Sequence, residues 1–201
     1  MMSELAAQTT ERLTQSKENW TGFLDSAAWL YKYPFHEQVL IHAQRPDATA
    51  CAPIELWNNA FKRWVNKGAK GIAIIDDSGQ KPTLRYVFDV SDTNTRYNIP
   101  FRLWQTKPEY EAQIIEELQN RFGDIGVEDA DFSSAVLGIA INAVSDNYDD
   151  YKNELLKAAG NSALADMSDD EISSTFMVLL MTSVAHTVFA VSYTHLRAHE
   201  T

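Results

Sequence analysis

A pair of histidines near the end of the chain has the spacing of a metal-binding motif. His195 and His199 are four residues apart and are followed by Glu200, so a helix would place both imidazoles on one face. A zinc site needs at least one further protein ligand, and the HExxH order of zinc proteases is absent. These residues therefore do not predict a metal site.

Acidic residues on either side of a predicted β-hairpin form a second candidate group: Asp76, Asp77, Asp89 and Asp92. Carboxylates in such a group can hold a metal ion or act as an acid and a base. Aspartates near turns more often accept hydrogen bonds from the backbone, which is the interpretation we favour. No base is fixed beside the single Cys51, so we expect a small buried residue there. We expect no catalytic site, no metal and no cofactor.

The turn Lys67-Gly-Ala-Lys-Gly71 combines two lysines with two glycines. A phosphate-binding P-loop follows a strand and precedes a helix, with Ser or Thr after its lysine. Here the predicted order is helix, turn, strand, and no hydroxyl follows. The turn therefore does not predict nucleotide hydrolysis. Its amides and lysines are suited to contacting phosphates of a nucleic-acid backbone, although a simple solvated turn explains the same residues.

Aromatic residues lie among the basic ones just before this turn. Trp57, Phe61 and Trp64 are interleaved with Lys62 and Arg63. Single-stranded nucleic acid is bound by such a combination, because bases stack on rings while cations follow the phosphates. The spacing of the three rings is also that of a helix stripe packed into a core, which is the more common case.

The net charge of −11 is unevenly distributed along the 201 residues. Residues 1–105 hold 12 Lys or Arg and 11 Asp or Glu, whereas residues 106–190 hold 4 and 16. The two parts therefore carry +1 and −12, and the last eleven residues are neutral. The cations are concentrated between Lys62 and Arg102, which is the part of the chain best suited to an anionic partner. One cysteine and no secretory signal indicate a cytoplasmic protein.

Hydrophobic periodicity indicates the elements that would position these residues. It predicts helices over residues 10–32, 35–44 and about 53–64, then strands over 72–75 and 84–90 that form a hairpin. After Pro108 it predicts helices over 109–122, 132–144 and 148–159, and a last one that begins with a capping box at Ser168 and Glu171. We interpret residues 172–190 as a buried helix, because Ser, Thr and His interrupt the apolar run.

The expected fold class is therefore α+β and helix-rich. A small antiparallel hairpin or sheet packs on N-terminal helices within residues 1–105, and residues 106–190 form an acidic helical extension. Residues 191–201 resemble the translation of a transposase-end sequencing adapter rather than protein sequence. We therefore expect the natural protein to continue past about residue 190, and the histidine pair to be an artefact.

Several motifs occur in the order found in one known family. They are Trp20-x-x-Phe23-Leu24, Tyr33-Pro-Phe35, Gln38-Val-Leu-Ile41, Ala43-Gln-Arg-Pro-Asp-Ala-Thr49, Val65-x-Lys67-Gly-x-Lys70-Gly-Ile72 and Tyr86-Val-Phe-Asp-Val-Ser91-x-Thr93. Over residues 18–93 the chain resembles the ArdC-type antirestriction N-terminal domain, in the form found at the front of large conjugative transposon and plasmid proteins. The resemblance implies a single-stranded DNA-binding module that precedes methylase and helicase segments. The family's protease motif HExxH is absent.

We therefore expect a single-stranded DNA-binding module of a larger mobile-element protein, with downstream domains of the same polypeptide as a further partner and no membrane. The expected nucleic-acid-binding residues are Arg45, Lys62, Arg63, Lys67, Lys70, Lys81, Arg85 and Arg96. The motifs leave open whether Gln44, Arg45 and Pro46, or Lys67 and Lys70, contact DNA or hold the fold. The alternative is a protein-interaction or intramolecular docking module that does not bind nucleic acid.

Overall fold

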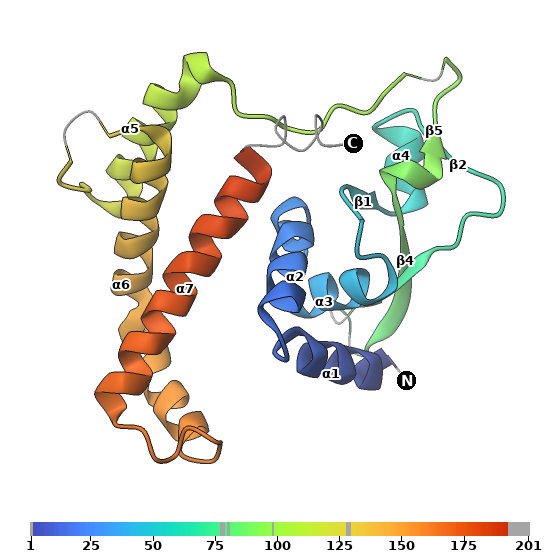
Figure 1. Ribbon diagram of the computed structural model, residues 1–201. Helices are drawn as coiled ribbons and strands as arrows, with labels where there is room; N and C mark the ends of the chain where they lie inside the picture. The colour runs from blue at the N-terminus through green and yellow to red at the C-terminus, as the bar shows by residue number, and fades with distance from the viewer. Residues whose placement is uncertain (1, 77–78, 80, 98, 128–129, 193–201) are drawn as a thin grey trace. The chain divides into compact units, whose positions relative to one another are not determined.

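The computed structural model describes residues 2–76, 79, 81–97, 99–127 and 130–192. The chain divides into two compact units, Met1–Trp104 and Gln105–Thr201, and each is described by itself. The first unit combines helices with short antiparallel strands, and the second is helical (Figure 1). The predicted α+β, helix-rich fold class is confirmed. The histidine pair at 195 and 199 and residues 193–201 of the predicted adapter segment lie outside the described residues.

Three helices of the first unit lie on one side of its strands. They are α1 (Met2–Leu13), α2 (Lys17–Trp29) and α3 (Phe35–Gln44). The prediction for α3 is confirmed, but the single helix predicted over 10–32 is wrong. The Ser16 hydroxyl accepts a 3.2 Å hydrogen bond from the Asn19 amide and starts a new helix. The Asn19 side chain donates to the Arg12 carbonyl at 2.9 Å, which fixes the corner between the two helices.

The helix predicted to reach Trp64 ends earlier. Helix α4 spans Ile54–Asn59, and Trp64–Val65 form strand β2, which pairs with β5 (Thr93–Asn94). Lys62 has a φ of 52°, a left-handed conformation that an α-helix cannot contain. The predicted apolar stripe is therefore divided: Trp57 is buried, whereas Phe61 and Trp64 are exposed.

The sheet of the first unit is antiparallel, in the order β1-β4-β3. Its strands are β1 (Cys51–Ala52), β3 (Ile72–Asp76) and β4 (Thr83–Asp89), and a 3₁₀ turn follows at Val90–Asp92. Ile72 pairs with Val87 and Ile75 pairs with Leu84, so the predicted hairpin is confirmed. Side chains alternate between the faces, because successive residues of a strand point in opposite directions.

One face of this sheet packs on the helices and forms the core of the first unit. Ile72, Ile74 and Val87 join Leu30, Leu40, Ile41 and Ala48 in one buried cluster, and a second cluster lies between α1, α2 and α3. Figure 1 shows these helices gathered beside β4. Burial of this apolar face fixes the register of the hairpin, since a slip of one residue would turn the core residues outward.

The second unit contains η2 (Pro108–Tyr110) and three helices: α5 (Glu111–Phe122), α6 (Phe132–Ala159) and α7 (Asp169–Ser192). The two helices predicted over 132–144 and 148–159 are one, because residues 145–147 contain no glycine or proline to stop it. The Asn147 side-chain nitrogen instead donates to the Ala143 carbonyl one turn earlier, at 2.7 Å. Helices α6 and α7 run side by side in opposite directions (Figure 1).

Helix α7 begins at the predicted capping box. The Ser168 amide donates to the Glu171 carboxylate at 2.9 Å, and the Glu171 amide donates to the Ser168 hydroxyl at 3.3 Å. The prediction that this helix is buried is wrong: only 17% of its most apolar window is buried. In the described part of the chain, α7 alone is long and apolar enough to cross a membrane, with a mean hydropathy of 1.7, which by itself is weak evidence for a span.

Candidate nucleic-acid interface

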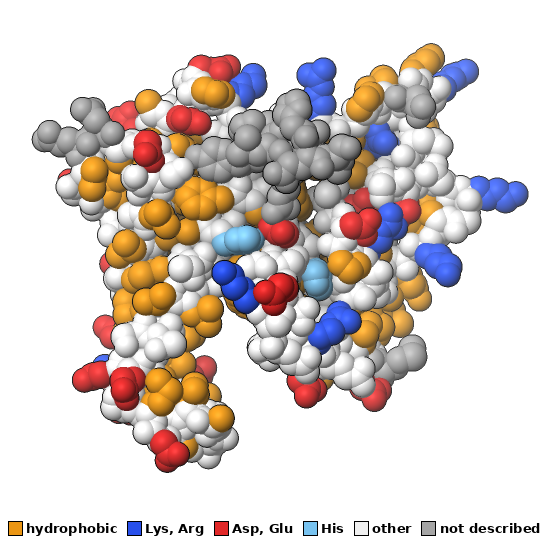
Figure 2. Space-filling model, in the orientation of Figure 1, with side chains coloured by type: hydrophobic (Ala, Val, Ile, Leu, Met, Phe, Trp, Pro, Cys, Tyr) orange, Lys and Arg blue, Asp and Glu red, His pale blue; other side chains and the backbone are white. Residues whose placement is uncertain are grey.

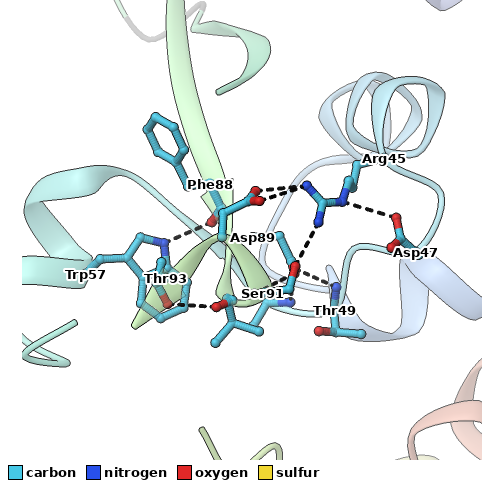
Figure 3. Close-up of polar contacts among 11 residues, drawn as sticks. Arg45, Asp47, Thr49, Trp57, Phe88, Asp89, Ser91 and Thr93 are labelled. Carbon is cyan, nitrogen blue, oxygen red and sulfur yellow. Dashed lines mark hydrogen bonds and ion pairs between the residues drawn. The ribbon is translucent and has the colours of Figure 1, made fainter. Parts of the chain in front are cut away.

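Arg45 is the centre of a polar network that joins α3 to the 3₁₀ turn after β4 (Figure 3). Its Nη1 donates to both carboxylate oxygens of Asp92, at 3.1 and 2.9 Å. Its Nη2 donates to the Ser91 hydroxyl at 2.8 Å, and its Nε donates to Asp47 at 3.2 Å. The hydrogen bond to Asp92 raises the pKa of the Arg45 guanidinium above its ordinary, already high value. The guanidinium is thus held by internal acceptors.

Asp89 is buried beside this network and organises two loops. One carboxylate oxygen accepts the amides of Thr49 and Ala50, at 2.8 and 3.0 Å. The other accepts the amide and the hydroxyl of Ser91, at 3.0 and 2.7 Å. Within the described residues no group of three His, Cys, Asp or Glu side chains is placed to hold a metal ion. The interpretation of Asp89 as a turn-forming residue agrees with these contacts.

Two further arginines of the predicted DNA-binding set also have internal partners. Arg63 is buried and donates to the hydroxyl and carbonyl of Thr93, at 2.7 and 3.1 Å, and to the Ile99 carbonyl at 2.9 Å. Arg85 donates from Nη2 to both oxygens of the buried Glu37, at 2.8 and 2.9 Å. All three arginines therefore help to hold the fold, Arg85 through Nη2 alone, and their assignment to DNA contact stays a prediction.

Gln44 has a structural role as well. Its amide nitrogen donates to the Ala73 carbonyl at 2.8 Å, and its amide oxygen accepts the Ala73 amide at 3.0 Å. The side chain therefore imitates a neighbouring strand at the free edge of β3. Glu37 was missing from the predicted functional residues, whereas for Gln44 the motif left open a DNA contact or a role in holding the fold. Nothing in the local sequence indicated their partners, which lie 48 and 29 residues away.

The other five predicted residues remain exposed: Lys62, Lys67, Lys70, Lys81 and Arg96. None of them has a hydrogen bond or ion pair with another described residue. Lys67 and Lys70 lie on the connection between β2 and β3, where Gly68 has a φ of 88°. This connection forms one edge of the unit, and Figure 2 shows Lys and Arg side chains that project from that edge. Unpaired cations at an edge are available to phosphates without first breaking an internal ion pair.

The connection is tied to the body of the unit at its start. The Asn66 amide donates to the Asp92 carbonyl at 2.8 Å, and the side chains of Asn66 and Asn94 are joined at 2.7 Å. The Ala69 amide closes the turn on the Asn66 carbonyl at 3.0 Å. The lysines at 67 and 70 are therefore held on a turn with fixed ends rather than on a free loop.

Aromatic and apolar side chains lie on the outward face of the sheet next to this turn. Leu84 and Tyr86 of β4 are 51% and 54% exposed, and Phe88 on the same face is half-buried. Gly71 lies against the two rings: a Cβ added there would be 3.2 Å from atoms of both Tyr86 and Phe88. The absence of a side chain at 71 brings the basic turn close to Tyr86. We refer to Lys67, Lys70, Tyr86 and Phe88 as the basic–aromatic face.

A second group of rings closes the other end of the unit. Trp57, Phe61 and Phe101 are in mutual contact, with centroids 5.2–5.6 Å apart, and Trp57 donates from its indole to the Phe88 carbonyl at 2.9 Å. Arg63 lies over the Phe101 ring. Trp57 is therefore a core residue, as expected from the interpretation of its ring as part of a stripe packed into a core. Trp64, on β2, does not join this group and is exposed.

The remaining reactive groups of the first unit are held in unreactive environments. Burial raises the pKa of the Cys51 thiol to about 12, and the pKa of Tyr33 is raised for the same reason. The Tyr33 hydroxyl donates to the Cys51 carbonyl at 2.7 Å. Ser26 and His42 share a buried hydrogen bond of 2.9 Å between α2 and α3, and burial lowers the pKa of His42. Ser26 and His42 are thus buried between α2 and α3, and Cys51 is partly buried against the core.

Comparison of the chain with protein-family models, with curated proteins and with solved structures found no match. The assignment of function therefore depends on the site itself.

Proposed function

We propose that residues 1–105 form a single-stranded DNA-binding module, and that the basic–aromatic face is its binding surface. The observation that carries the proposal is the placement of two lysines, unpaired among the described residues, beside the exposed Tyr86 ring and the half-buried Phe88 ring on one face of the sheet. Bases can stack on Tyr86 while Lys67 and Lys70 approach the phosphates. Such contacts do not read base identity, so binding tolerates any sequence.

Two features favour a single strand over a duplex. Stacking on a ring requires an unpaired base, which a duplex does not offer. The described cations on this face are few, and the chain as a whole carries −11, so phosphate attraction alone is weak. Stacking must therefore contribute much of the affinity. In this proposal the module belongs to a cytoplasmic DNA-processing protein of a mobile element and contributes binding rather than catalysis.

Charge reversal on the basic turn tests this surface. The full chain with Lys67→Glu/Lys70→Glu is titrated against a fluorescein-labelled oligothymidylate in an anisotropy assay. The matched control is Lys152→Glu/Lys157→Glu on α6, which changes the net charge equally and also replaces exposed, unpaired lysines. We expect at least a tenfold loss for the first variant and little change for the second. Equal losses in both variants would contradict the assigned surface.

A second candidate function is protein docking by the acidic second unit. Residues 106–190 carry −12, which repels DNA and attracts basic partners. Absence of any salt-sensitive oligonucleotide binding by the wild-type chain would favour this function. The two functions use different units, so they are compatible.

A further inference from the structure

Helix α7 exposes apolar surface that its own unit does not cover. Thr175, Val178, Leu179 and Thr182 are all exposed and are spaced i, i+3, i+4 and i+7, so they form one stripe along the helix. Val178 and Leu179 are 61% and 52% exposed. We call these four residues the α7 stripe. Isolated exposed apolar residues are ordinary, whereas a stripe on an otherwise apolar helix is a typical docking surface.

Several hydroxyl groups of α7 donate to carbonyls of their own helix. Thr182 donates to the Val178 carbonyl at 2.8 Å, Ser183 to Leu179 at 2.7 Å and Thr187 to Ser183 at 2.8 Å. These three hydroxyls are therefore satisfied by the helix itself, one turn back, whereas the Thr175 hydroxyl has no hydrogen bond to another described residue. Within the stripe, Thr182 can lose its water to an apolar partner without leaving its hydroxyl donor unpaired.

Negative charge predominates where α6 ends and α7 begins. Helix α7 starts with Asp169, Asp170 and Glu171, and Glu171 is exposed one turn before Thr175. Because α6 and α7 are antiparallel, the second half of α6, with Asp146, Asp149 and Asp150, runs beside the first half of α7. Residues 146–171 hold 8 acidic and 2 basic side chains, for a charge of −6. Figure 2 shows hydrophobic side chains over the middle of α6 and α7, with acidic ones toward the connection between the two helices.

We propose that the α7 stripe binds an amphipathic helix of a partner protein, whose apolar face covers Val178 and Leu179 and whose Lys or Arg side chains meet the carboxylates of residues 146–171. This combination of apolar stripe and opposite rim charge is the chemistry of helix-in-groove recognition. In a dimer of this chain, two acidic segments that each carry −6 would face and repel each other. An anionic membrane surface would be repelled by the same segment. The inference does not depend on the DNA-binding proposal, which uses the other unit.

The probe is a labelled synthetic peptide of Leu and Lys arranged with helical periodicity, compared with a scrambled peptide of the same composition. The full chain is titrated in an anisotropy assay. We expect the periodic peptide to bind and Val178→Gln/Leu179→Gln to weaken it by about tenfold or more. Circular dichroism checks that the variant keeps its helix content. The matched control is Ile54→Gln/Leu56→Gln, an exposed apolar pair in the first unit, which should bind as wild type.

Four results would overturn the proposal. Equal affinity for the scrambled peptide would show attraction by charge alone. Unchanged binding by Val178→Gln/Leu179→Gln would place the peptide elsewhere. Sedimentation showing a wild-type dimer that these substitutions dissociate would assign the stripe to a second copy. Flotation of the wild-type chain with neutral phosphatidylcholine vesicles, lost in the same variant, would assign it to a membrane.

Discussion

Replacing the buried Asp89 with asparagine should strongly destabilise the first unit. The carboxylate accepts four hydrogen bonds, from the amides of Thr49, Ala50 and Ser91 and from the Ser91 hydroxyl. An amide of the same shape has one oxygen and one NH₂ group, and the NH₂ must face one of the two pairs of donors. The less costly orientation directs it toward Ser91, where the hydroxyl can turn and accept but the backbone amide cannot.

The cost follows from these contacts. The unmade bond to the Ser91 amide costs about 1.5–3 kcal/mol, because its acceptor was charged. The hydrogen bonds from the Thr49 and Ala50 amides remain, but their acceptor becomes a neutral oxygen, which costs about 1 kcal/mol each. Part of this is offset because a neutral amide is easier to bury than a carboxylate. We expect Asp89→Asn to lower the free energy of unfolding by about 3 kcal/mol.

Urea unfolding followed by tryptophan fluorescence measures this change. All five tryptophans lie in residues 1–104, and Trp57 is buried next to β4, so the signal reports on the first unit. Asp47→Asn is the control: its side chain is 78% exposed, and it should change stability by no more than about 1 kcal/mol. If Asp89→Asn unfolds at the wild-type urea concentration, the carboxylate does not organise the two loops and our account of this network is wrong.

Three further outcomes can be measured on the same protein. The raised pKa of Cys51, about 12, should leave its thiol unreactive toward a disulfide reagent at mildly alkaline pH until urea unfolds the chain; rapid labelling of the folded protein would contradict the burial of this thiol. Burial lowers the pKa of His42, so the unfolded state takes up a proton first as pH falls below about 6.5. Stability should therefore be full above that pH and decline below it, and a urea midpoint that is flat between neutral and mildly acidic pH would refute this. Gly68→Ala should cost about 1 kcal/mol because the φ of 88° disfavours a side chain, and an unchanged urea midpoint would show that the turn relaxes.

Local signals predicted much of the fold. The bounds of α3 follow from Pro34 before it and the apolar spacing within it, and the capping box at Ser168 marks the start of α7. The β3–β4 hairpin follows from strand-like runs around turn formers. Errors arose where a local feature overrode periodicity. The Ser16 side chain starts a new helix inside a continuous apolar pattern, and the left-handed backbone of Lys62 lies between α4 and β2.

The roles of the basic residues could not be derived from composition. Arg45, Arg63 and Arg85 find their partners 47, 30 and 48 residues away, at Asp92, Thr93 and Glu37. A charge count treats these arginines and the exposed lysines alike, whereas packing separates them. The lysines at 67 and 70 are exposed on the turn between β2 and β3 and have no ion pair with another described residue. The exposed side of α7 was also missed, since an apolar helix can be covered by its own unit or by a partner.

Salt dependence of oligonucleotide binding tests the central proposal most directly. The dissociation constant of the wild-type chain for oligothymidylate is measured from about 50 to about 200 mM salt, beside a duplex of equal length. We expect single-strand binding that weakens with salt, and a slope of log K against log salt that becomes shallower by about 1.4 in Lys67→Glu/Lys70→Glu, or about 0.7 for each lost phosphate contact. Absence of salt-sensitive binding at micromolar protein, or a preference for the duplex, would contradict the proposal.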